Sequence, residues 1–298
     1  MKLKAVSFGE ILWDIFPNYK VIGGAPLNLI LRMKSFGHDC NIVSSVGNDK
    51  NGNDILKYLS INKISIDTIS VSSKYPTGLV DIKFDNKSDV KYSIKYPVAW
   101  DFIQNSYLIE KIVKNCDLFF FGSLSSRSET SANSLNKLLE IAKYKIFDVN
   151  LRPPHFKIES IIKLMNKSNF IKFNEEEINL ICHELGCKMK PLEDKISFIS
   201  SYSKTKNICV SRGGQGAILY TNDKYYYNKG FKVKTKDTVG SGDSFLAMLI
   251  SELKKGIDPI QSLKRACAIG AIVSMREGAN PKIGMNYIND FLKKSVIP

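Results

Sequence analysis

A glycine-rich turn in the last quarter of the chain carries residues that are suited to phosphoryl chemistry. Residues 237–245 read Asp-Thr-Val-Gly-Ser-Gly-Asp-Ser-Phe, and apolar residues at helical spacing continue from Phe245 to Leu253. The start of a helix leaves free backbone N–H groups at the positive end of its dipole, and such groups bind anions, most often phosphates. Gly240 and Gly242 allow the backbone to approach an anion closely.

Asp243 lies in the same turn, where a carboxylate would repel a bound phosphate unless it acts on a third group. A general base that takes a proton from an attacking hydroxyl group fits this position. The competing interpretation is an acidic residue that only caps the helix. The turn taken alone favours that second interpretation.

Two other stretches place polar or flexible residues where a ligand could bind. Asp14 lies among apolar neighbours just beyond a predicted strand at 4–9, and ligands of α/β sheets bind beyond the carboxyl ends of strands. An ordinary turn aspartate is the alternative. Gly23 and Gly24 precede an apolar helical pattern that ends near Gly37, which suggests a contact between backbone and ligand.

The elements around these residues predict an α/β fold. Strand-like and helix-like segments alternate from end to end, which is typical of a mainly parallel sheet covered by helices on both faces. Residues 231–236 alternate between apolar or β-branched residues and lysines, which predicts a half-buried strand directly before the glycine-rich turn. Residues 77–85 and 90–94 alternate too, and with the turn at 85–89 they predict a hairpin.

Composition narrows the class of protein. The chain has 298 residues, of which 44% are hydrophobic, and this is enough for one large core. No apolar run reaches the length of a membrane span, and the first residues do not resemble a signal peptide, so we expect a cytoplasmic protein without a membrane partner. The net charge of +14 comes from scattered lysines, which does not favour a nucleic-acid partner. The six cysteines include no C-x-x-C pair and are expected to be reduced thiols.

Five motifs, in order along the chain, resemble those of the ribokinase (PfkB) family of carbohydrate kinases. Residues 237–243 resemble its carboxyl-terminal signature, with Ser241 in place of the common alanine, and residues 23–28 resemble its amino-terminal signature. The intermediate motifs lie at 46–52, 174–177 and 211–216. The resemblance covers essentially the whole chain. The pattern at 9–17 resembles fructokinase-like members, and that at 148–154 resembles the fructokinase-like and keto-sugar-acid kinase branch.

The resemblance implies a fold and a domain organisation. The expected fold is a ribokinase-like three-layer α/β sandwich with a mainly parallel central sheet and a small β-lid. A single carbohydrate kinase domain would span residues 1–298. The lid would come from about 11–22 and 75–101, and the family also implies that two lids could pair in a homodimer.

The same resemblance implies roles around a sugar. Asp243 would be the catalytic base, and the N–H groups of Gly240, Ser241, Gly242 and Asp243 would form an anion hole for the transferred phosphoryl group. The residues expected to bind the sugar are Asp14, Gly23, Gly24 and Asn28. Arg152 could contact the sugar or a phosphate, and a salt bridge with Asp148 is an equal alternative.

Nucleotide and metal sites follow from the resemblance as well. The residues expected to bind ATP are Asn174, Ser211, Gly213, Gly216, Gly242 and Cys267, the last of them in the adenine pocket. Glu177 would help to hold Mg²⁺ through water, although acidic residues also suit the start of a helix. Backbone near Asp237, Val239 and Gly278 could hold a monovalent cation such as K⁺.

We therefore expect an ATP-dependent sugar kinase. The fructokinase-like motifs favour phosphorylation of the primary hydroxyl group of fructose to give fructose 6-phosphate. A kinase for ribose, 2-keto-3-deoxygluconate or a nucleoside is one alternative. A protein of the same fold that binds sugar or nucleotide without catalysis is another.

Overall fold

A nine-stranded sheet forms the centre of the molecule in the computed structural model, which describes residues 1–84 and 90–294. Its strand order is β13-β12-β11-β10-β9-β8-β1-β4-β5, in which the pairs β11–β12 and β12–β13 are antiparallel and the other neighbours are parallel. The strands are β1 (Lys4–Phe8), β4 (Asp39–Gly47), β5 (Ile69–Ser72), β8 (Leu118–Gly122), β9 (Lys145–Asp148), β10 (Phe170–Asn174), β11 (Ile208–Ser211), β12 (Ala217–Thr221) and β13 (Lys224–Asn228). The prediction of a mainly parallel sheet is confirmed.

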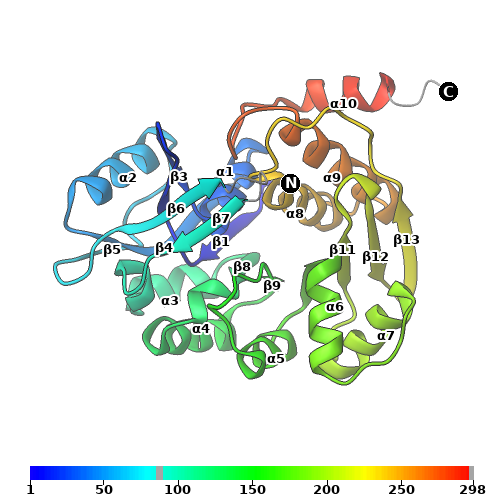
Figure 1. Cartoon of the computed structure of the whole chain (residues 1–298), viewed down its shortest axis with the longest axis horizontal. Coiled ribbons are helices and arrows are strands. Elements are labelled where there is room, and N and C mark those ends of the chain that lie inside the picture. Colours follow the sequence, from blue (N-terminus) through cyan, green and yellow to red (C-terminus); the bar gives the residue numbers. More distant parts are fainter. Residues whose placement is uncertain (85–89, 295–298) are drawn as a thin grey trace.

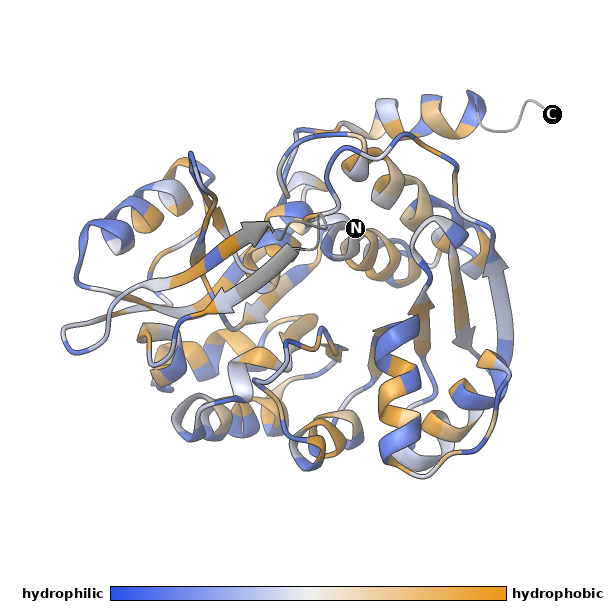
Figure 2. Ribbon diagram, viewed as in Figure 1, coloured by the Kyte–Doolittle hydropathy of each residue, from blue (hydrophilic) through white to orange (hydrophobic). Residues whose placement is uncertain are grey.

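Helices cover both faces of this sheet, so the molecule has three layers (Figure 1). One face is covered by α1 (Ala25–Ser35), α2 (Lys50–Ile61), α8 (Ser241–Lys254), α9 (Pro259–Ser274) and α10 (Met285–Lys294). The other is covered by α3 (Tyr107–Lys114), α4 (Glu129–Ile141), α5 (Ile158–Asn166), α6 (Glu175–Glu184) and α7 (Leu192–Ser203). Figure 2 shows α6 with alternating polar and apolar segments, as expected for a helix with one buried face.

The alternation of side chains along β10 decides which layer each residue faces. Phe170 packs in the core on the α8 side, whereas Ile171 and Phe173 pack in the core on the opposite side. Because successive side chains of a strand point to opposite faces, Lys172 points toward the α8 side. A lysine is thus directed at the start of α8 from inside the sheet.

A second, smaller sheet lies beside the first one near α1 (Figure 1). Its order is β3-β2-β6-β7, from β2 (Leu12–Ile15), β3 (Lys20–Gly23), β6 (Gly78–Phe84) and β7 (Val90–Ile94). Strands β6 and β7 pair antiparallel, which confirms the expected hairpin, and its turn at 85–89 lies outside the described residues. The apolar residues Leu12, Val80 and Ile82 give this sheet a small core of its own.

The strand predicted at 231–236 is wrong. These residues form an extended loop without strand pairing, and Gly230, with φ +75°, turns the chain away from β13. The alternating pattern has another cause: Phe231 packs edge-on against Phe291 at a centroid distance of 5.2 Å, and Lys232 and Lys234 are exposed. A segment that is buried on one side and exposed on the other shows this alternation. Here a helix, and not a neighbouring strand, covers the buried side.

In the part of the chain that the structure describes, we find no helix with the length and apolar character needed to cross a membrane.

Candidate active site

Two cavities meet at the N-terminus of α8. The smaller has a volume of about 260 Å³ and the larger about 520 Å³. Lys172, Thr238 and Gly242 line both of them. Groups at this helix start can therefore reach a molecule in either cavity.

The turn before α8 has the backbone conformation that its glycines suggested. Gly240 has φ +72°, and a Cβ at this position would collide with the carbonyl oxygen of Ala279. The N–H groups of Gly240, Gly242 and Asp243 make no hydrogen bond to other described residues. The Ser241 N–H is different, because it donates to the Thr238 carbonyl oxygen over 3.2 Å. The expected set of four free N–H groups is thus reduced to three.

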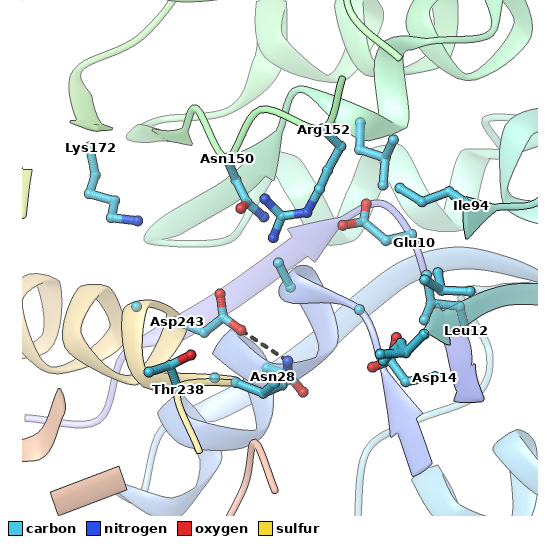
Figure 3. Close-up of a pocket in the computed structure, with 18 residues that line it drawn as sticks. Glu10, Leu12, Asp14, Asn28, Ile94, Asn150, Arg152, Lys172, Thr238 and Asp243 are labelled. Atoms are coloured by element: carbon cyan, nitrogen blue, oxygen red, sulfur yellow. Dashed lines mark hydrogen bonds between the residues drawn. The ribbon is translucent and has the colours of Figure 1, made fainter. Parts of the chain in front are cut away.

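Asp243 lines the smaller cavity, and its carboxylate is held by an amide from α1 (Figure 3). The Asn28 side chain donates from Nδ2 to Asp243 Oδ2 over 2.9 Å. Burial and the nearby carboxylate of Asp148 raise the pKa of Asp243 to about 6, against the opposing effects of Asn28, Lys172 and Arg152. A carboxylate with that pKa is ionised at neutral pH and more basic than an ordinary one.

Two further carboxyl groups and one arginine face the smaller cavity (Figure 3). Burial raises the pKa of Glu10 to about 7 and that of Asp14 to about 6, and the charge of Arg152 opposes both shifts. Glu10 Oε2 is buried and has no hydrogen-bond partner among the described residues. The cavity therefore holds three carboxyl groups, one guanidinium and the ammonium group of Lys172, whose charge Asp148 balances.

The two glycines between β3 and α1 differ in their surroundings. Gly24 lines the smaller cavity, and its positive φ of +109° brings its backbone against the carbonyl of Glu10. Gly23 is not among the residues that line either cavity. A Cβ on Gly23 would collide with the Asp14 carboxylate, so Gly23 leaves room for Asp14 to turn inward.

Asp148 pairs with Lys172 and not with Arg152. Lys172 Nζ lies 3.0 Å from Asp148 Oδ1, and both side chains are buried. Arg152 donates instead to the carbonyl oxygen of Leu151 over 3.0 Å and lines the smaller cavity. The salt bridge considered as an alternative for Arg152 is thus wrong, and Arg152 is free to contact a ligand.

The larger cavity gathers all six residues that the motifs assigned to a nucleotide: Asn174, Ser211, Gly213, Gly216, Gly242 and Cys267. They come from the ends of β10 and β11, the turn between β11 and β12, and helices α8 and α9. Gly216 has φ +86°, and a Cβ there would collide with the Asn228 carbonyl oxygen. The turn can therefore pack this closely against the end of β13 only with glycine at this position.

Glu177 is engaged as a helix cap. Its carboxylate accepts from the Leu151 N–H over 2.9 Å and from the Asn174 N–H over 2.7 Å, while Asn174 Oδ1 accepts from the Glu177 N–H. Burial raises its pKa despite the neighbouring Lys172. Each carboxylate oxygen thus holds one backbone N–H, and Glu177 lines neither cavity, so we expect it to act on a metal ion through water or through Asn174.

The residues expected around a monovalent cation do lie together. The Asp237 carboxylate accepts from the Val239 N–H and from the Gly278 N–H, each over 3.0 Å. This carboxylate therefore ties the turn before α8 to the loop that follows α9. Among the described residues we find no cluster of three or more His, Cys, Asp or Glu side chains that could hold a metal ion.

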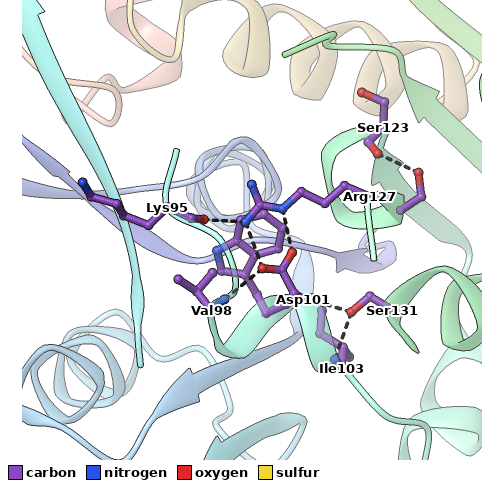
Figure 4. Close-up of polar contacts among 9 residues, drawn as sticks. Lys95, Val98, Asp101, Ile103, Ser123, Arg127 and Ser131 are labelled. Carbon is purple, nitrogen blue, oxygen red and sulfur yellow. Dashed lines mark hydrogen bonds and ion pairs between the residues drawn. The ribbon is translucent and has the colours of Figure 1, made fainter. Parts of the chain in front are cut away.

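A buried ion pair anchors the segment that leaves the small sheet (Figure 4). Arg127 donates to both oxygens of Asp101 over 2.7 and 2.9 Å, and to the carbonyl oxygen of Lys95 over 2.6 Å. Its guanidinium also lies 4.0 Å above the ring of Trp100. These contacts join the end of β7 to the short turn before α4 and give the small sheet a fixed point on the main body.

Sequence reasoning missed several residues that line the cavities or contact Asn28: Glu10, Asn150, Lys172, Thr238 and Asn280. A signal existed for four of them, since Thr238 and Asn150 lie inside the motifs at 237–243 and 148–154. Lys172 interrupts the apolar run of a buried strand, and Glu10 directly follows the strand-ending Gly9. Asn280 has no such signal, because its contact depends on how a loop after α9 meets α1.

Comparisons with known proteins identify the family of the chain. Residues 17–283 match the model of the pfkB family carbohydrate kinases. The chain is 26% identical over 310 residues to fructokinase-1 of Zea mays, with 93% of this chain and 94% of the relative covered.

Solved structures show the same fold. A fructokinase with bound ATP from Xylella fastidiosa has a TM-score of 0.85 at 19% identity, with 99% of each chain covered. A fructokinase double mutant from Vibrio cholerae, bound to fructose, ADP and potassium ion, has a TM-score of 0.84 at 20% identity, with 98% of this chain and 99% of that chain covered. The expected ribokinase-like fold is confirmed.

Proposed function

The chain belongs to the pfkB family of carbohydrate kinases, and we propose that it transfers the γ-phosphoryl group of ATP to the primary hydroxyl group of fructose. The observation that carries this proposal is the junction of the two cavities at Lys172, Thr238 and Gly242. Phosphoryl transfer requires a donor and an acceptor that meet in line at one charged site. The start of α8 lies at such a meeting point.

We assign the larger cavity to ATP and the smaller one to the acceptor. The larger cavity has twice the volume and is lined by glycines of the β11–β12 turn, which suit a nucleotide phosphate chain. The smaller one holds Glu10, Asp14 and Asn28, whose oxygen and nitrogen atoms suit sugar hydroxyl groups. The fructokinases from Xylella fastidiosa and Vibrio cholerae, which share the fold, are bound to ATP and to fructose with ADP, respectively.

Asp243 is the proposed general base. It lines the acceptor cavity at the first turn of α8, so a hydroxyl group bound there can give up its proton to the carboxylate as it attacks the phosphorus atom. The free N–H groups of Gly240, Gly242 and Asp243 can receive the charge of the transferred phosphoryl group. Lys172 is directed at the same place and adds a fixed positive charge, partly balanced by Asp148.

Mg²⁺ would screen the charge of the ATP phosphates during transfer. The donor set fits an ion held mainly by phosphates and water, as is usual for Mg²⁺, because Asn174 lines the nucleotide cavity, whereas Glu177 lies outside that lining with its carboxylate on the N–H groups of Leu151 and Asn174. We propose that the backbone around Asp237, Val239 and Gly278 would hold a monovalent cation. The hydrogen bonds of Asp237 already hold that backbone in one place.

The charge of the acceptor cavity favours a neutral sugar. Three carboxyl groups face Arg152, while the charge of Lys172 is compensated by Asp148. A carboxylated acceptor would add a fourth acidic group to a partly buried space, which is electrostatically unfavourable. We therefore favour fructose over 2-keto-3-deoxygluconate as the acceptor, and the relative from Zea mays is itself named a fructokinase.

The small sheet is the proposed lid. Val80, Ile82 and Ile94 of β6 and β7 line the acceptor cavity. Movement of this sheet about its anchor at Arg127 would exclude water and limit hydrolysis of ATP. Pairing of two copies through the same sheet stays a prediction.

Release of ADP from Mg-ATP over a panel of acceptors tests this proposal. The panel contains fructose, ribose, glucose, 2-keto-3-deoxygluconate and a nucleoside, each with and without K⁺. We expect turnover with fructose to exceed that with every other acceptor. Turnover with another acceptor would keep the mechanism and change the substrate, whereas ATP binding without any turnover would overturn the assignment as a fructokinase.

A further inference from the structure

The loop that follows α9 is tied to the catalytic region at four consecutive positions. Each of the residues 278–281 contacts a residue of the turn before α8 or of α1. The four pairs are Gly278 with Asp237, Ala279 with Gly240, Asn280 with Asn28, and Pro281 with Arg32. The contact between Asn280 and Asn28 links this loop to the proposed base Asp243, because Asn28 is itself hydrogen-bonded to Asp243.

Three side chains form a chain of hydrogen bonds. Asn280 Nδ2 donates to Asn28 Oδ1 over 2.7 Å, and Asn28 Nδ2 donates to Asp243 Oδ2 over 2.9 Å. Asn28 is buried, and Asn280 Oδ1 is buried without a hydrogen-bond partner among the described residues. The bond to Asn28 is therefore the one side-chain hydrogen bond that Asn280 makes within the described chain.

The direction of these bonds follows from the chemistry of the last member. An ionised carboxylate only accepts hydrogen bonds, so Asn28 must turn its NH₂ group toward Asp243. Its Oδ1 then points away and needs a donor, which Asn280 supplies. Without that donor the buried Asn28 Oδ1 would lose its partner, and the orientation of the amide that Asp243 requires would be less favourable.

We propose that Asn280 is a positioning residue, which keeps the Asn28 amide in the orientation that holds the base Asp243 ready for proton transfer. This proposal rests on the proposed kinase function of the site. Asn280 touches neither the acceptor cavity nor the nucleotide cavity in the described structure. Its effect on turnover should therefore pass entirely through Asn28.

A double-mutant cycle on Asn280→Ala and Asn28→Ala tests this dependence. We expect Asn280→Ala alone to lower kcat about fivefold, the effect of one neutral hydrogen bond, with the KM for ATP unchanged. In the Asn28→Ala background the same substitution should change kcat by less than about 1.5-fold. An equal loss in both backgrounds would show an independent role and overturn the proposal.

Two further variants separate positioning from a loss of fold. Asn280→Asp keeps the shape of the side chain but has no hydrogen to donate, so it should lower kcat at least as much as the alanine variant. The matched control is Lys282→Ala, since Lys282 is exposed on the same loop, and it should match the wild-type kcat. A Lys282→Ala variant as impaired as Asn280→Ala would mean that the loop is merely sensitive to change.

The pH dependence of kcat/KM gives a readout that a structural role would not move. The ionisation of Asp243 is also influenced by Asp148, Lys172 and Arg152, and by Glu10 and Asp14 across the acceptor cavity. These groups are unchanged in Asn280→Ala, so a shift of the acid limb to higher pH reports on the Asn28 amide. An unshifted limb together with an unchanged kcat would contradict the proposal.

A measurement without turnover separates this proposal from the proposed function. In protein labelled with ¹⁵N at asparagine, the side-chain NH₂ signals of Asn28 are identified by their loss in Asn28→Ala. In the wild type they should move as Asp243 titrates, and in Asn280→Ala this response should weaken. A weakened response in a protein that phosphorylates no acceptor would support the hydrogen-bond chain and refute the kinase assignment, and an unaltered response would refute the chain.

Discussion

Lys172 Nζ lies 3.0 Å from Asp148 Oδ1, and this ion pair is buried beneath the junction of the two cavities. The two residues are direct partners in the register of the parallel strands β9 and β10. Burial by itself would lower the pKa of Lys172, but the carboxylates of Asp148 and Glu177 overcome that effect and raise the pKa above its ordinary value. The lysine therefore carries a permanent charge at the site.

Replacing this lysine tests how far the pair supports the fold as well as the chemistry. We expect Lys172→Met to lower the free energy of unfolding by about 3–5 kcal/mol, because it leaves the Asp148 carboxylate buried and unpaired. The double variant Lys172→Met with Asp148→Leu should recover most of that loss in urea unfolding, yet stay weakly active. A single variant as stable as the wild type would show that Asp148 finds water or another partner.

Replacement of the proposed base tests the mechanism. We expect Asp243→Asn to reduce kcat by about 10²–10⁴, the usual contribution of a general base. The amide is nearly isosteric, so the thermal midpoint and the affinity for ATP should match those of the wild type. Turnover within threefold of the wild type would assign Asp243 to helix capping.

The raised pKa of Asp243 predicts an acid limb at an unusual position. The base must be ionised to accept a proton, so kcat/KM should rise with pH and reach its plateau above the pKa of about 6. An ordinary carboxyl group would place this limb near pH 4. Arg152→Met removes a charge that lowers the pKa of Asp243, so the limb should then move to higher pH. A limb near pH 4 in the wild type would argue against a buried base.

Two glycines with similar backbone conformation allow a controlled test of the turn before α8. Gly240 and Gly256 have φ of +72° and +79°, but only Gly240 is packed against another segment, at Ala279. We expect Gly256→Ala to cost about 1–2 kcal/mol of stability, the strain of a left-handed residue, and to leave kcat unchanged. Gly240→Ala should in addition lower kcat/KM about 100-fold, because it displaces the N–H groups that face the phosphoryl group. Equal activity of the two variants would count against an anion hole at this turn.

Local pattern was sufficient to predict much of the fold, whereas the nucleotide and acceptor sites were predicted from the resemblance to the ribokinase (PfkB) family. The alternation of strands and helices led to a mainly parallel sheet between two helical layers, which is confirmed. The glycine-rich turn was placed correctly at the start of a helix, and the residues predicted to bind nucleotide and acceptor, apart from Gly23, line two adjoining cavities. Turn conformation and helix starts depend on a few neighbouring residues, so the sequence by itself determined them.

Only the tertiary structure decided which distant groups meet. Asn28 and Asp243 are 215 positions apart, and Asn280 is 252 positions from Asn28. The alternation at 231–236 suggested a strand because it indicates that one side of the segment is buried. It does not indicate whether a strand or a helix covers that side. Likewise, the choice of Lys172 over Arg152 as the partner of Asp148 depends on strand register. Such contacts arise from the packing of whole layers, and no short stretch of sequence contains that information.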